Sequence, residues 1–137
     1  MTETVLRKSI FLKATPKEVC AYLTDPEKLA IWFHKPTTPL VEGAYEMFGT
    51  ESGDKLMWGD VTVSDPYSTL EYTFTIAPMG DAVSTVKWKL VEVAGGTNLI
   101  LHHEGLPQGA DSFGLTLALD KGWDDHLDRM RTSLHGE

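Results

Sequence analysis

The spacing of hydrophobic residues changes along the chain. Apolar and polar side chains alternate over residues 4–14, which predicts a strand. Two short helices are predicted next, over 16–23 and 26–33, because each segment begins with a capping residue directly before a proline. Glu18, three residues after Thr15, completes a capping box for the first helix. The chain is therefore expected to open with one strand and two short helices.

A period of two returns between residues 43 and 103. Gly and Pro divide this alternation into five or six strands, and the Ala-Gly-Gly at 94–96 is typical of a hairpin turn. Successive strands joined by short turns pair as an antiparallel meander. The period then becomes three to four over residues 113–134, which predicts a helix about 33 Å long.

The long helix has one apolar stripe and one charged face. The stripe, which we expect to pack against the sheet, ends in Trp123, Leu127, Met130 and Leu134. The side chains between them are expected to face water, and they include Asp124, Asp125, His126 and Asp128. Gly114 and Gly122 also lie in this helix, where glycine is unfavourable, so we expect a close backbone contact or a kink at each.

Composition and charge exclude several classes of partner. The net charge is −8, and the 12 Lys and Arg residues are scattered, so nucleic acid is not an expected partner. No apolar run reaches the length of about 20 residues that spans a bilayer, so membrane insertion is not expected either. Cys20 is the one cysteine, and residues 1–13 lack an apolar signal segment. We therefore expect one domain over residues 1–137, located in the cytoplasm.

Four stretches, in order, carry a resemblance to a known family: ATPKEVCAYLTDPEKLAIWF, GDVTVSDPYSTLEYTFT, GGTNLILHHEGLP and GWDDHLDRMRTSL. The chain resembles the SRPBCC or START-like superfamily, and within it the domains of the activator of heat-shock protein 90 ATPase. The resemblance implies an α+β helix-grip fold. In that fold a curved antiparallel sheet of six to seven strands wraps around a long C-terminal helix, with two short helices after the first strand and usually a cavity between sheet and helix. Cys20 stands where relatives often have Trp, which predicts more space behind the first helix.

One histidine cluster, around residues 102–104, has side chains that could serve a metal or catalytic site. Strand alternation places His102 and Glu104 on one face of their strand and His103 on the other, toward the interior. A metal site needs at least three convergent ligands, so we expect no metal and no cofactor here. His103 is expected to be a hydrogen-bonded interior histidine, and no catalytic residue is assigned.

The favoured function is binding of a hydrophobic or aromatic, lipid-like small molecule between sheet and C-terminal helix. His103 or the hydroxyls of Tyr45 and Tyr72 would bind its polar end. The residues predicted to contact this ligand are Trp32, Tyr45, Met47, Met57, Phe74, Trp88, His103, Phe113 and Leu117.

Two other functions stay open at the level of sequence. One is a co-chaperone-like or stress-response module that binds a protein partner such as a chaperone. The other is a polyketide cyclase-like enzyme with His103 as general base. Binding is favoured over catalysis, and the sequence does not decide whether the protein forms a homodimer.

Overall fold

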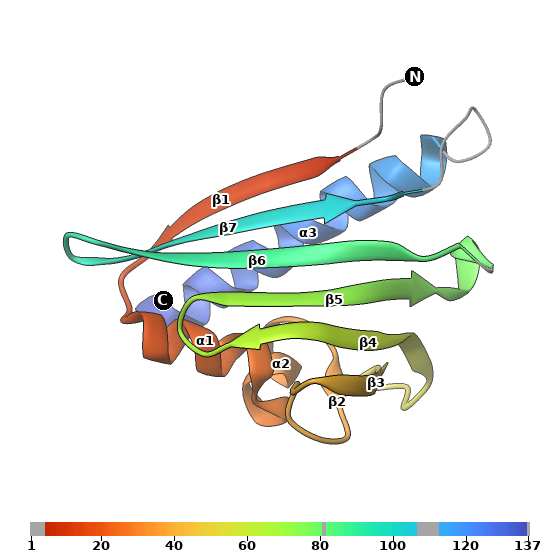
Figure 1. The fold of residues 1–137 in the computed structure, drawn as a ribbon, viewed down its shortest axis with the longest axis horizontal. Coiled ribbons are helices and arrows are strands. Elements are labelled where there is room, and N and C mark those ends of the chain that lie inside the picture. Colours follow the sequence, from red (N-terminus) through yellow and green to blue (C-terminus); the bar gives the residue numbers. More distant parts are fainter. Residues whose placement is uncertain (1–4, 81, 107–112, 137) are drawn as a thin grey trace.

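The computed structural model describes residues 5–80, 82–106 and 113–136, which form a sheet and three α-helices (Figure 1). The elements follow one another as β1 (Leu6–Leu12), α1 (Pro16–Thr24), α2 (Pro26–Trp32), β2 (Lys35–Pro36), β3 (Gly43–Phe48), β4 (Lys55–Asp65), β5 (Thr69–Ile76), a 3-10 turn (Ala77–Met79), β6 (Ser84–Val93), β7 (Gly96–Glu104) and α3 (Phe113–His135). The predicted order of elements is confirmed. The two-residue strand β2 is an addition that no alternation predicts.

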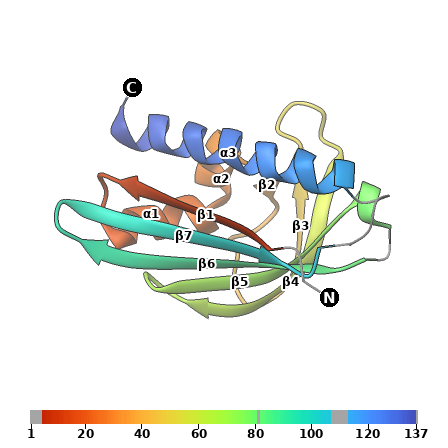
Figure 2. The same ribbon diagram turned by 90° about the horizontal axis from the view of Figure 1, so that it is seen from above.

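The seven strands form one antiparallel sheet in the order β1-β7-β6-β5-β4-β3-β2. Figure 2 shows that the sheet is curved and that α3 runs along one side of it. Helix α3 contacts α2 and strand β1, while α1 contacts β6 and β7. This is the predicted α+β helix-grip fold.

Local signals in the sequence set the helix and hairpin boundaries. The Thr15 hydroxyl accepts from the backbone N–H of Glu18, and the Glu18 carboxylate accepts from the backbone N–H of Thr15, so the capping box is confirmed. Asp25 ends α1 and also caps α2 through its side chain. Gly95 has φ +83° in the turn between β6 and β7, a conformation that suits glycine.

The apolar stripe of α3 is confirmed, but the two glycines of this helix have no close contacts. Trp123, Leu127 and Met130 are buried. A Cβ atom placed on Gly114 or Gly122 would meet no heavy atom within 4 Å, so the expected close contact is wrong for both. The reason is that open space, not backbone, lies beside Gly122.

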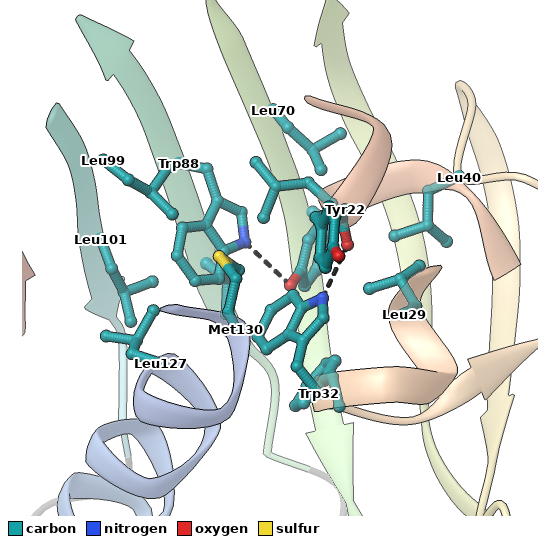
Figure 3. Close-up of a cluster of buried hydrophobic side chains, with 14 of the residues drawn as sticks. Tyr22, Leu29, Trp32, Leu40, Leu70, Trp88, Leu99, Leu101, Leu127 and Met130 are labelled. Atoms are coloured by element: carbon teal, nitrogen blue, oxygen red, sulfur yellow. Dashed lines mark hydrogen bonds between the residues drawn. The ribbon is translucent and has the colours of Figure 1, made fainter. Parts of the chain in front are cut away.

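The core between sheet and helices is rich in tryptophan, and its polar groups are paired. Figure 3 shows Trp32 and Trp88 facing one another, with Met130 of α3 beside them. The Trp32 indole N–H donates to the Tyr22 carbonyl at 2.7 Å, and the Trp88 indole N–H donates to the Tyr72 hydroxyl at 3.0 Å. Indole rings can therefore be buried here without leaving an unsatisfied donor.

Candidate functional site

A pocket of about 280 Å³ lies where α2 ends, between β5 and α3. We call it the α2–α3 pocket. This volume is just below the usual range for small-molecule sites, about 300–1,000 Å³, so the pocket suits a small ligand. Its walls are mostly apolar, and its lining residues are Phe33, His34, Phe74, Ile76, Leu115, Ala118, Leu119, Gly122, Trp123 and His126.

The small residues of α3 explain why this space exists. The lining residues of α3 recur at intervals of three or four and therefore share one helix face. Ala118 and Gly122 lie one turn apart on that face, and the missing Cβ of Gly122 leaves room for a ligand rather than for the sheet.

The Phe33 ring joins the two histidines of the pocket to Trp123. Phe33 stacks on His34 at a ring-centroid distance of 4.4 Å and on Trp123 at 5.3 Å. The His126 ring meets Phe33 edge-on at 4.8 Å. These contacts hold both imidazole rings in an aromatic wall, so the polar groups of the pocket are positioned before any ligand arrives.

The hydrogen bonds of His126 within the described part of the chain use one of its two ring nitrogens, Nδ1. Its Nδ1 lies 2.9 Å from the Trp32 carbonyl oxygen and 2.6 Å from Arg129 Nη2. A single nitrogen cannot donate to the first and accept from the second at once, so one contact is made at a time. When Nδ1 donates to the carbonyl, Nε2 is an acceptor, and when Nδ1 accepts from Arg129, Nε2 is a donor.

Both pocket histidines are held toward their neutral form. Burial lowers the pKa of His126 to about 4, although the hydrogen bond to the Trp32 carbonyl opposes this shift. Burial also lowers the pKa of His34, and the charge of Arg129 adds to the effect. The pocket therefore presents neutral imidazoles to a ligand near neutral pH.

His103 lies deeper and is fully enclosed. The Trp123 indole N–H donates to its Nδ1 at 3.0 Å, so Nε2 carries the proton of the neutral ring and donates to the Ser84 hydroxyl at 2.7 Å. The Ser84 hydroxyl in turn donates a hydrogen bond to the Phe74 carbonyl at 2.9 Å. Burial lowers the pKa of His103 to about 4. The predicted interior, hydrogen-bonded histidine is confirmed, and its geometry leaves no free lone pair for a general base.

The structure brings few of the nine predicted ligand residues to the α2–α3 pocket. Phe74 lines it. Six others are buried in the core or against the sheet, namely Trp32, Tyr45, Met47, Met57, Trp88 and His103. Neither Tyr45 nor Tyr72 is among the residues that line this pocket, and both hydroxyls have protein partners: that of Tyr45 donates to the Thr73 carbonyl at 2.6 Å, and that of Tyr72 accepts from Trp88.

Phe113 and Leu117 do not face the cavity as predicted. They are 64% and 54% exposed. Each is two residues from the pocket residue Leu115, which corresponds to a rotation of about 200° around the helix, so both side chains lie on the opposite face. The predicted apolar face of α3 is therefore wrong for the first turns of the helix, at Phe113 and Leu117.

Apart from Phe74, none of the residues that line the pocket was predicted to contact a ligand, and the two unpredicted residues with polar side chains are His34 and His126. The sequence predicts His126 on the water-facing side of α3, yet it is half-buried and lines the pocket. Its position three residues after Trp123 places it next to the apolar stripe, and this spacing was the available signal. The other charged positions are as predicted, since Asp124, Asp125 and Asp128 are exposed.

Metal ligation and membrane spanning find no support in the part of the chain that the structure describes. No three His, Cys, Asp or Glu side chains gather there in a way that could hold a metal ion. Among the same residues, no helix combines the length and the apolar character needed to cross a membrane.

Together the curved sheet, the enclosed helix face and the pocket between them define a helix-grip protein. The family model described as "Activator of Hsp90 ATPase homolog 1-like protein" matches residues 13–135, and the chain belongs to this family. No curated protein matches the chain.

Several solved structures share the fold. MLL2253 from Mesorhizobium loti has 20% sequence identity and a TM-score of 0.82, over 94% of this chain and 95% of that one. PFC0360w, an HSP90 activator from Plasmodium falciparum, has 18% identity and a TM-score of 0.79, over 96% of both chains. DynU16, from the dynemicin biosynthetic locus, has 23% identity and a TM-score of 0.81 over 96% of this chain. The present chain spans about half the length of DynU16, 47% of that chain.

Proposed function

We propose that the protein binds a hydrophobic or aromatic small molecule in the α2–α3 pocket. The observation that carries this proposal is the pocket itself, with apolar walls and two imidazole rings held in place by Phe33. An apolar pocket with a few placed polar groups is the usual form of a small-molecule site. Ligand apolar surface leaves water on binding, and the imidazoles of His34 and His126 bind its polar end.

The first experiment measures ligand binding directly. Trp123 lines the pocket, so a bound aromatic molecule changes tryptophan fluorescence. We expect members of a library of aromatic and lipid-like molecules to raise the melting temperature and to change this fluorescence in a saturable way. If no member does either at millimolar concentration, the proposal is wrong.

A pair of matched variants then locates the site. Gly122→Leu places a side chain into the open space of the pocket and should abolish binding of the library molecule identified first. Gly114→Leu is the control, because Gly114 lies on the same helix, also has open space around its Cβ position, and does not line the pocket. Equal affinities of the two variants would place the molecule elsewhere.

A second candidate function is that of a co-chaperone. It is supported by the family description and by the printed name of PFC0360w as an HSP90 activator. In this case the outer surface would bind the chaperone, and the protein would raise the chaperone's ATPase rate. Gly122→Leu should then leave this stimulation unchanged. If the protein neither binds the chaperone in a pull-down nor raises its ATPase rate, this function is wrong.

A further inference from the structure

A second pocket, of about 500 Å³, lies between α1, residues 39–41 and the turn that joins β4 to β5. We call it the α1–turn pocket. Figure 1 shows the β4–β5 turn next to α1. This pocket shares no lining residue with the α2–α3 pocket, so the function proposed above does not use it.

Small side chains on α1 leave this space open. Cys20, Ala21 and Thr24 line it from α1, together with the longer side chain of Lys17. Its floor includes Leu40 and Leu70, which are 1% and 4% exposed and belong to the buried cluster of Figure 3. Cys20, at the position where the sequence predicts more space behind the first helix, is one of the residues that line this pocket, which has an apolar base.

The turn carries an aromatic ring at a position that normally requires glycine. The Ser68 N–H donates to the Asp65 carbonyl at 3.1 Å, with Pro66 and Tyr67 between them. Tyr67 has φ +69°, so it occupies the third position of a type II turn, where glycine is usual. Among the described residues it is the one non-glycine residue with positive φ, and such strained positions gather at ligand clamps.

The Tyr67 ring is available for a ligand. It is 52% exposed and lines the α1–turn pocket. Within the described ranges no other aromatic ring stacks on it. An exposed ring held in a strained turn beside an apolar space has the geometry of a stacking surface.

The charges around this pocket limit the ligand. Asp25 and Asp65 bring two carboxylates to its lining and Lys17 brings one ammonium, on a protein with a net charge of −8. An anion would meet net repulsion here. We propose that the α1–turn pocket binds a flat aromatic molecule that carries no negative charge, with the Tyr67 ring stacked on one face and the Leu40–Leu70 floor beneath it.

Two dyes with the same ring system test both parts of this proposal. N-phenylnaphthylamine is uncharged, and anilinonaphthalene sulfonate is its anionic counterpart. Both are titrated by fluorescence into the Gly122→Leu protein, in which the α2–α3 pocket is filled. We expect the uncharged dye to bind at least tenfold more tightly than the sulfonate. Equal affinities, or no binding of the uncharged dye, would overturn the proposal.

Cys20 reports whether the dye occupies this pocket. It is the one cysteine of the chain and lines the pocket, so its reaction with dithiodipyridine measures access to that space. Saturating N-phenylnaphthylamine should slow the reaction at least tenfold, with half-maximal protection at the Kd obtained from fluorescence. A reaction rate unaffected by bound dye, or a Cys20 that does not react in the free protein, contradicts the proposal.

Variants of the turn identify the stacking residue. Tyr67→Gly keeps the turn, since glycine suits its backbone, and should weaken dye binding about tenfold while the melting temperature is retained or raised. Tyr67→Phe keeps the ring and should bind like the parent protein. Wild-type affinity in Tyr67→Gly would show that the ring makes no contribution and would refute its role.

Discussion

Acid pH should destabilise this protein through His103. The side chain is 0% exposed, and burial lowers its pKa from an unfolded value of 6.5 to about 4 in the folded protein. Between these two values the unfolded chain binds a proton that the folded protein excludes, so unfolding becomes easier as the pH falls. The stability contributed by the neutral ring is complete above about pH 6.5, decreases toward pH 4 and changes no further below that.

The size of this effect follows from the same two pKa values. One pKa unit corresponds to about 1.36 kcal/mol, so the full loss is roughly 3 kcal/mol. Between pH 7.5 and pH 5, His103 alone should lower the free energy of unfolding by about 2 kcal/mol. This is a large part of the stability of a typical domain, which is about 5–15 kcal/mol.

The assay is urea unfolding at pH 7.5, 6 and 5, followed by tryptophan fluorescence, for the wild type and for His103→Gln. The glutamine cannot titrate, so the variant should be less stable at pH 7.5 but should lose about 2 kcal/mol less on going to pH 5. His34 and His126 remain in both proteins, so their contributions cancel in the comparison. His102→Gln, on the outer face of β7, is the matched control for loss of a histidine from this strand. If His103→Gln retains the full wild-type pH dependence, His103 is not the buried neutral histidine described here.

Three further predictions concern stability and are measured by the same urea unfolding. Gly122→Ala should raise the free energy of unfolding by about 0.5–1 kcal/mol, because alanine favours the helix and its Cβ meets open space. Gly59→Ala is the contrasting variant and should lower the free energy of unfolding, because a Cβ there would collide with the backbone of β5. A loss of stability in Gly122→Ala would mean that other protein atoms occupy the space beside Gly122, which contradicts an open pocket there. Thr15→Ala removes the cap of α1 and should cost about 1 kcal/mol, and an unchanged midpoint would argue against the capping box. Ser84→Ala leaves the Nε2–H of His103 without its acceptor and should cost about 1–3 kcal/mol, so a neutral result would contradict the hydrogen-bond chain.

The helices and strands of the fold could be predicted from the sequence because their signals are local. A capping box needs only Thr15 and Glu18 three residues apart, and a hairpin turn needs only the glycines at 95 and 96. The stripe of α3 around Trp123 follows from the helical period alone. These patterns survive in the structure because each is satisfied within one element or between neighbours in the chain.

The α2–α3 pocket was harder to predict because it depends on which residues are small and on how α3 is rotated about its axis. The helical period predicts Phe113 on the inner face, yet the face of α3 that lines the pocket at this end carries Leu115 and Ala118 instead. The sequence suggests a close contact at Gly122, where the structure has open space. Glycine permits both, and the sequence alone cannot distinguish them. The environment of His126 likewise depends on α2, which is distant in the sequence.

The sequence by itself determined the order of strands and helices, the inward direction of His103 and the family to which the chain is similar. It did so because alternation, capping and helical period are properties of neighbouring residues. Only the tertiary structure decided that Trp123 and Ser84 occupy both nitrogens of His103, and that His34 and His126 supply the polar groups of the α2–α3 pocket. The physical reason is that hydrogen-bond partners and cavities arise where distant segments pack together, and many different packings are compatible with the same local pattern.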